Sequence, residues 1–330
     1  MKILFIGQKN NTNNYLNDYM SDLLLHGLRE IFGFEVVDYP GSWYLYEDES
    51  IKRKLDKNKL WGKGFSVSNI LHNYEKIDRT DIILKIKKKY FDLIIYGSIR
   101  RNSSFLDIAL ENNNKVIFID GEDDNYIENG LLSKGLFFKR ELNISQSNVH
   151  PISFAIPKSK IKKSIQQKKN FLLSPLIPGK LKTYIYEDEE NYNTMYQNSI
   201  FALTYKKAGW DCFRHYEILM NGCIPFFLDL ENCPKLTINN FPKKKILYIN
   251  RKYKNILSYY NPFQIFKKKF LNIKRISKFF TFKFKKLDPQ KYFEENDELL
   301  DCKIDLLDYT KKNLTTENLG NYLIDKFNKS

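Results

Sequence analysis

Short apolar runs alternate with segments of helical periodicity along the first half of the chain. We expect buried strands at residues 2–7, 34–39, 91–97 and 115–124, where apolar residues follow one another and end in Gly, Pro-Gly or an acidic loop. Between these runs the apolar residues recur every three or four positions, which predicts helices at residues 14–32, 77–89 and 105–112. Strands that alternate with helices predict a parallel, doubly wound sheet.

The alternation restarts after residues 150–161, a stretch with two prolines that we interpret as the crossing between two domains. Further strands are expected at residues 169–178, 199–205, 223–229 and 244–250. Helices are expected at residues 187–198, 212–221, 297–312 and 316–327, and Gly222 is a C-cap for the second of these. The sequence therefore predicts an α/β protein with two Rossmann-like domains, 1–155 and 156–330, that bind ligands in the cleft at the carboxyl ends of their strands.

The positive charge is concentrated in one segment. The 330 residues carry a formal net charge of +15, and residues 243–287 hold fifteen Lys or Arg and no Asp or Glu. Because Phe and Ile accompany the lysines, we expect this segment to contact an anionic membrane surface. Nucleic acid is the alternative polyanion, which we favour less, and a solvated connection packed on the second domain is the plain structural reading.

Composition also argues against several other classes of protein. The four cysteines form no CxxC pair, so we expect no zinc site, and neither a metal nor another cofactor is expected. The first apolar run is only four residues long before Gly7, and no apolar segment of 18 residues follows. We therefore expect a cytoplasmic protein, peripheral on a membrane if the basic segment binds one.

Residues 199–227 combine a strand, a basic loop and a helix that carries an Arg and a Glu one turn apart. A helix start with free amides, close to Lys206, Lys207 and Arg214, suits a diphosphate. Glu217 lies on the same helical face as Arg214 and can accept the hydroxyls of a ribose. His215 is the one histidine in this candidate site. The alternative is a surface αβ unit with an ordinary Arg–Glu pair.

The segment RHYEILMNGCIPFF, Arg214 to Phe227, resembles the nucleotide-sugar segment of exostosin-like glycosyltransferases. The wider B-fold (GT-B) glycosyltransferase superfamily has a similar arrangement in its donor domain. The resemblance covers about thirty residues and implies that Arg214 faces the diphosphate, Glu217 the ribose, and Gly222 the base or sugar pocket. The loop KKAGWDC departs from the exostosin pattern, and there Trp210 and Asp211 are local substitutes, with Trp210 a stacking platform.

The acidic loop after the strand at 115–124 is the candidate source of a catalytic base. Asp120, Glu122 and Asp123 lie where the first domain meets the cleft, and direct displacement at a sugar requires a carboxylate near the acceptor hydroxyl. A divalent-metal site and a solvated loop are the alternatives, and the resemblance implies metal-free catalysis. Lys139 and Arg140 follow and are candidates to contact the leaving diphosphate.

These observations predict a glycosyltransferase that moves a sugar from a nucleotide-sugar to a glycan or a lipid-linked acceptor. Whether the sugar configuration is inverted or retained stays open. One alternative is a DNA-base glucosyltransferase, whose basic segment would hold a duplex. The other is a non-catalytic nucleotide-binding or glycan-binding protein of the same fold.

Overall fold

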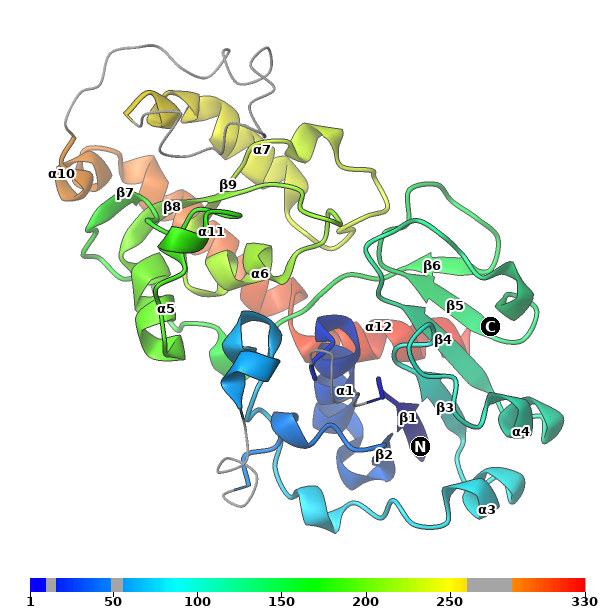
Figure 1. The fold of residues 1–330 in the computed structure, drawn as a ribbon. Coiled ribbons are helices and arrows are strands. Elements are labelled where there is room, and N and C mark those ends of the chain that lie inside the picture. Colours follow the sequence, from blue (N-terminus) through cyan, green and yellow to red (C-terminus); the bar gives the residue numbers. More distant parts are fainter. Residues whose placement is uncertain (10–15, 49–55, 260–286, 330) are drawn as a thin grey trace.

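The computed structural model describes residues 1–9, 16–48, 56–259 and 287–329, which form two bodies, each built on a parallel sheet (Figure 1). The first sheet has the order β2-β1-β3-β4-β5-β6. Its strands are β1 (Ile3–Ile6), β2 (Val36–Tyr39), β3 (Leu93–Tyr96), β4 (Val116–Asp120), β5 (Leu136–Lys139) and β6 (Val149–Pro151). The second sheet has the order β7-β8-β9, with β7 (Phe171–Leu173), β8 (Ser199–Thr204) and β9 (Ile224–Phe227). All the strand pairs in both sheets are parallel, which confirms the predicted α/β fold.

Helices flank both sheets. In the first half they are α1 (Tyr19–Phe32), α3 (Ile82–Lys87) and α4 (Leu106–Glu111). In the second half they are α5 (Glu189–Gln197), α6 (Phe213–Met220), α7 (Lys243–Lys252), α10 (Pro289–Glu294), α11 (Asp297–Asn313) and α12 (Thr316–Asn328). The start of α1 at Tyr19 is fixed by Asp18, whose carboxylate accepts the backbone N–H groups of Met20 and Ser21.

Two sequence predictions are wrong in this part of the molecule. Residues 244–250, predicted as a strand, lie in α7, where Ile246 and Ile249 are buried three positions apart while Lys244 and Lys245 are exposed. That spacing is helical rather than alternating. Within the predicted crossing at 150–161, residues up to Pro151 belong to β6, which pairs with β5, so the crossing begins after that strand.

The last helix returns to the first domain. Helix α12 packs along α1 at a very short distance, since a Cβ atom added to Gly27 would lie 1.9 Å from the backbone oxygen of Thr316. His26 Nδ1 and Thr316 Oγ1 lie 2.8 Å apart across the same contact. The end of the chain therefore ties the two bodies together, although the sequence suggested that it stays with the second.

None of the helices in the described ranges is long and apolar enough to cross a membrane. Of the basic segment 243–287, residues 260–286 lie outside the described residues. The predicted membrane contact of that segment therefore stays a prediction.

Candidate functional site

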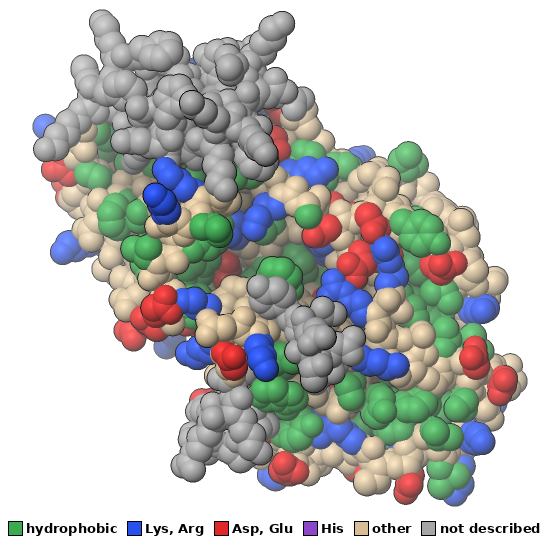
Figure 2. Space-filling model, viewed as in Figure 1, with side chains coloured by type: hydrophobic (Ala, Val, Ile, Leu, Met, Phe, Trp, Pro, Cys, Tyr) green, Lys and Arg blue, Asp and Glu red, His purple; other side chains and the backbone are tan. Residues whose placement is uncertain are grey.

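A cavity of about 640 Å³ lies between the two bodies and is lined by residues from both. That volume is typical of a site for a small molecule or cofactor. Its first wall comes from the segment before α1, from residues 61–65 and from the loop after β4, and its second wall from the loop after β8 and the start of α6. Lys, Arg, Asp and Glu side chains gather around the hollow near the middle of the face seen in Figure 2. The cavity thus lies at the carboxyl ends of strands from both sheets, where the sequence predicts a ligand.

The start of helix α6 faces this cavity. Its N-cap residue, Cys212, makes no side-chain hydrogen bond to the first turn, and residues 211–214 all line the cavity. The first N–H groups of a helix have no partner within the helix, and together with the helix dipole they favour an anion. The loop and helix therefore present uncapped amides to whatever occupies the cavity.

Arg214 carries hydrogen-bonding capacity that the described protein does not use. Its Nη2 donates to the hydroxyl of Tyr184 at 2.9 Å, and its guanidinium lies 5.5 Å from the centre of the Tyr184 ring. Nε and Nη1 are shielded from solvent and have no hydrogen-bond partner. A buried donor without a partner costs about 1–3 kcal/mol. Such a cost at a cavity wall is typical of a residue that binds a ligand.

Glu217 lies one turn further along α6 and also lines the cavity. Its Oε2 accepts the Tyr192 hydroxyl at 2.7 Å, and its Oε1 accepts the hydroxyl of Ser66, from the first body, at 3.3 Å. Burial raises the pKa of Glu217 to about 7, although the bond from Tyr192 and the charge of Arg214 oppose the rise. The two residues form no ion pair within 4.0 Å, so the Arg–Glu pair of the alternative interpretation is absent here.

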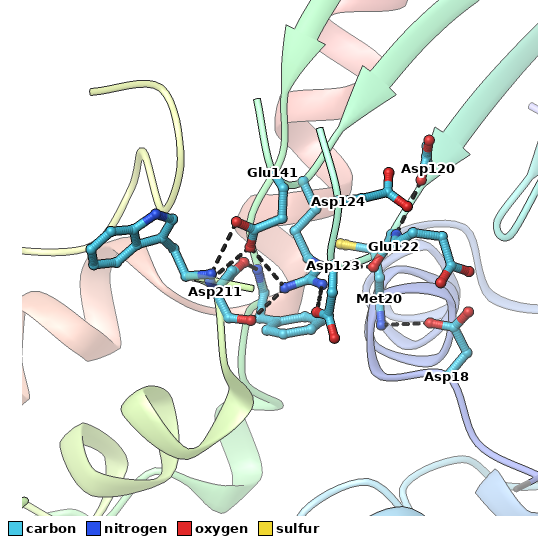
Figure 3. Close-up of polar contacts among 12 residues, drawn as sticks. Asp18, Met20, Asp120, Glu122, Asp123, Asp124, Glu141 and Asp211 are labelled. Carbon is cyan, nitrogen blue, oxygen red and sulfur yellow. Dashed lines mark hydrogen bonds and ion pairs between the residues drawn. The ribbon is translucent and has the colours of Figure 1, made fainter. Parts of the chain in front are cut away.

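The first body holds the loop before α6 in place. Glu141, two residues after the end of β5, accepts the backbone N–H groups of Trp210 at 2.9 Å and of Asp211 at 2.8 Å. Arg140 donates to the backbone oxygen of Asp211 and to the Glu141 carboxylate. Figure 3 shows Glu141 turned toward the backbone at Asp211. These contacts join the end of one sheet to the loop before α6 in the other body, and we call them the Arg140–Glu141 clasp.

The side chain of Asp211 also helps to hold the loop in place. Its Oδ2 accepts the backbone N–H of Phe154 at 2.9 Å, and burial raises its pKa to about 7 in spite of the nearby Arg140 charge. Gly209 is required two residues earlier, since a Cβ atom there would lie 2.6 Å from Glu141 Oε1 and 2.8 Å from Asp123 Oδ1. The close approach of two chains explains why this loop contains a glycine.

Of the predicted catalytic carboxylates, Asp120 is placed away from the cavity. It is buried and lies 2.9 Å from Lys139 Nζ, in an ion pair in which both side chains are fully shielded from solvent. Lys139 also lies 3.3 Å from Asp124. Neither Asp120 nor Lys139 lines the cavity. The pair is internal because β4 and β5 are neighbours in register, with Asp120 opposite Lys139. The predicted roles of Asp120 as a base and Lys139 as a diphosphate contact therefore do not fit the geometry.

Glu122 and Asp123 do line the cavity. Glu122 is held by the guanidinium of Arg101, at 2.5 Å from Nε and 3.1 Å from Nη2. The pKa of Glu122 is lowered, because the bonds and charge of Arg101 outweigh the opposing effect of burial. Asp123 forms an ion pair with Arg140 through Oδ1, and its side chain is about half exposed. Arg140 lines the cavity as predicted, but its donors are already engaged by Asp123, Glu141, Gly121 and Asp211.

Of the residues predicted to bind the sugar donor, some line the cavity and others do not. Lys207, Asp211, Arg214 and Glu217 line the cavity, whereas Lys206, Trp210, His215 and Gly222 do not. The ammonium group of Lys206 lies 5.3 Å from the centre of the Trp210 ring, so these two side chains contact each other.

His215 and Gly222 have structural roles. His215 is fully buried between Thr204 Oγ1 and the backbone oxygen of Trp210, and burial lowers its pKa to about 3. Gly222, with φ 64°, ends α6 at the end of the helix remote from the cavity; a Cβ atom there would meet Ile165 at 2.5 Å. The prediction that they contact the nucleotide-sugar does not fit these positions.

Several lining residues were not expected from the sequence. From the first body these are Asp18, Tyr19, Trp61, Lys63, Phe65 and Arg101, and from the second Leu181, Tyr184, Tyr186 and Tyr192. The aromatic residues among them carry no motif. Tyr184 and Tyr186 could have been noticed because they follow Pro178-Gly179, a loop directly after a predicted strand.

The described ranges contain no group of three His, Cys, Asp or Glu side chains arranged to hold a metal ion. The carboxylates of the loop after β4 are instead paired with arginine and lysine.

No known protein family matches the chain, and no curated protein sequence is similar to it. Solved structures with a similar fold include those of Anabaena Alr3699/HepE in complex with UDP, and in complex with UDP and glucose. They align over 100% of both chains, at 8% and 9% identity, with TM-scores of 0.47 and 0.48 respectively. At this distance the function of the chain has to be argued from its own residues.

Proposed function

We propose that the protein is a glycosyltransferase that moves a sugar from a nucleotide-sugar to a hydroxyl of a glycan or a lipid-linked acceptor. The two-sheet architecture with a shared cavity fits the GT-B arrangement that the resemblance of residues 214–227 implies. The proposal includes catalysis without a metal ion, since cationic side chains and helix amides are available for the leaving group. The donor would lie mainly against the second body and the acceptor against the first.

Arg214 is the observation that carries the proposal. Its Nε and Nη1 lack partners at the wall of the cavity, beside the uncapped start of α6. A small rotation of the side chain would direct both donors at phosphate oxygens, which a planar guanidinium binds in pairs. Lys207 lines the same wall and has no carboxylate partner among the described residues. Together they would stabilise the negative charge that develops on the departing diphosphate.

Glu217 would hold the ribose. Tyr192 and Ser66 each donate one hydrogen bond to its carboxylate, which fixes the side chain while leaving lone pairs for the two ribose hydroxyls. Because Ser66 belongs to the first body, ligand binding at Glu217 would also depend on how the two bodies meet.

Asp123 is the carboxylate best placed to act as the base. It lines the cavity and is half exposed, and Arg140 engages only its Oδ1. In a direct displacement, Asp123 would take the proton of the acceptor hydroxyl while that oxygen bonds to the anomeric carbon. The bond from the anomeric carbon to the diphosphate oxygen breaks, and the electron pair leaves with the diphosphate.

A thermal-shift screen with UDP-, GDP-, ADP- and CMP-sugars tests the donor class. We expect one nucleotide to raise the melting temperature, and we expect the same donor to release its sugar when acceptors are added. If the nucleotide binds and no donor is turned over with a broad acceptor set, the protein is a binding module of this fold. If no nucleotide binds, the proposal is wrong.

A further inference from the structure

Two segments at the mouth of the cavity expose large apolar side chains. Trp61 is 49% exposed and comes from the first body, while Leu181 is 77% exposed and comes from the second. Both line the cavity. Exposed apolar side chains that gather at one site mark a surface that binds something apolar. We call Trp61 and Leu181 the apolar rim.

The backbone beneath the apolar rim is firmly held. The N–H of Trp61 donates to Asn17 Oδ1 at 2.7 Å, and its carbonyl accepts the Tyr19 hydroxyl at 2.9 Å. On the other side, Thr183 Oγ1 accepts the N–H of Ile177 at 3.0 Å and donates to the Lys180 carbonyl at 2.7 Å. These bonds fix the backbone that carries the half-exposed indole and the exposed leucine at the cavity, so their exposure belongs to the fold.

The two parts of the rim are joined across the cavity mouth. Lys63, two residues after Trp61, donates to the Tyr186 carbonyl at 3.2 Å and pairs with Glu187. The two segments that carry Trp61 and Leu181 are therefore linked to each other. Arg214 and the exposed Lys207 supply positive charge to the same cavity. Exposed lysines, Lys59 and Lys182, accompany the apolar side chains in the two segments. This combination of apolar and cationic side chains at one cavity suits a molecule with an apolar tail and an anionic linkage to a sugar.

We propose that the apolar rim binds the lipid chain of an acceptor in which the glycan is joined to the lipid through phosphate. The inference rests on the proposed function and selects the lipid-linked acceptor from the two acceptor classes. Burying a leucine or tryptophan side chain against a hydrocarbon chain supplies enough free energy for about a tenfold gain in affinity.

The test compares farnesyl phosphate with isopentenyl phosphate by calorimetric titration, below the concentration at which farnesyl phosphate aggregates. The two probes share a phosphate and differ in the length of the hydrocarbon chain, so the ratio of their affinities measures the contribution of that hydrocarbon chain to binding. We expect farnesyl phosphate to bind about tenfold more tightly. Leu181→Ser and Trp61→Ala should each lower that ratio, and the double variant should bring it to near one. Ile144→Ser is the matched control, because Ile144 is 79% exposed and does not line the cavity.

Equal affinity of the two probes for the unmodified protein would overturn the inference, as would an unchanged ratio in both rim variants. A fall of the ratio in Ile144→Ser would also contradict it. Nucleotide titration of the same samples reports separately on the proposed function. If the unmodified protein binds no nucleotide, the proposed function is refuted. If it binds a nucleotide but binds the two probes equally well, only the lipid-chain site is refuted.

Discussion

The carboxylate of Glu141 accepts the backbone N–H of Asp211 at 2.8 Å, which joins the first sheet to the loop that begins α6 in the second body. Glu141 is buried and also accepts the N–H of Trp210. The Arg140–Glu141 clasp thus positions the loop that would bind the diphosphate. Glu141 itself does not line the cavity.

Replacing Glu141 tests the clasp. Glu141→Ala leaves two backbone donors unsatisfied and removes a partner of the buried Arg140, so we expect the free energy of unfolding to fall by about 2–4 kcal/mol. Nucleotide affinity should fall about tenfold because the loop loses its support. Glu141→Gln retains one acceptor oxygen and should therefore lose less stability and less nucleotide affinity. Urea unfolding and nucleotide titration measure the two effects, and unchanged affinity in Glu141→Ala would show that the clasp does not position the loop.

Gly209 provides a second, steric test of the same contact. A Cβ atom at this position would lie 2.6 Å from Glu141 Oε1, so Gly209→Ala should force the two chains apart and reduce the unfolding free energy by about 1–3 kcal/mol. Gly130→Ala is the control, since its nearest atom would be Glu128 Oε1 at an ordinary 3.5 Å. Similar stability of the two variants would contradict the packing described here.

Glu217 predicts a dependence of stability on pH. Its folded pKa of about 7 lies above the ordinary glutamate value of 4.5, so the folded protein binds more protons than the unfolded chain between these values. The contribution of Glu217 to stability is therefore complete below pH 4.5 and is lost as the pH rises through 7. Glu217→Gln should flatten this slope and raise the unfolding free energy at pH 8 by about 1–3 kcal/mol. Glu217→Gln should also weaken nucleotide binding at pH 8. Chemical unfolding and nucleotide titration between pH 4.5 and 8 measure the two effects. If the unfolding free energy of Glu217→Gln still falls with pH as steeply as that of the unmodified protein, the pH dependence does not come from Glu217.

Two lysines are buried together in the second body. Lys169 Nζ donates to the Gln197 carbonyl and Lys303 Nζ to the Ser199 carbonyl. Burial, with a smaller effect of Lys303, lowers the pKa of Lys169 to about 7, and burial lowers that of Lys303 to about 8.

The unfolded chain therefore binds more protons than the folded protein between about pH 7 and 10.5, and stability should rise with pH in this window. Lys169→Met should reduce that rise and raise the unfolding free energy at pH 7 by about 1–3 kcal/mol. Lys168→Met, at an exposed neighbouring position, should do neither. Urea unfolding at pH 7 and 9 measures the difference, and equal pH responses of the two variants would contradict this expectation.

The sequence predicts most strands because buried parallel strands are short apolar runs, such as residues 2–7 and 91–97. It does not predict β5, which contains Lys139, or β6, which has three residues and a proline. Lys139 is buried only because β5 pairs in register with β4 and brings it to Asp120, a relationship that no local pattern records.

The candidate site was predicted where it depends on spacing along one helix. Arg214 and Glu217 are one turn apart, and both line the cavity. The first wall was missed because its contacts join distant parts of the chain: Ser66 reaches Glu217 across 151 positions. Trp61 and Tyr19 are likewise brought together by the fold, since the Tyr19 hydroxyl donates to the Trp61 carbonyl.

The most direct test of the account is the affinity of Arg214→Ala for the nucleoside diphosphate that gives the largest thermal shift. Arg251→Ala, on the exposed face of α7, makes the same change in charge outside the cavity. A charge-assisted hydrogen bond contributes about 1.5–3 kcal/mol, so Arg214→Ala should bind the nucleotide roughly 10 to 100 times more weakly while Arg251→Ala binds it normally. Equal affinities of Arg214→Ala and the unmodified protein would contradict the assignment of this cavity to an activated sugar.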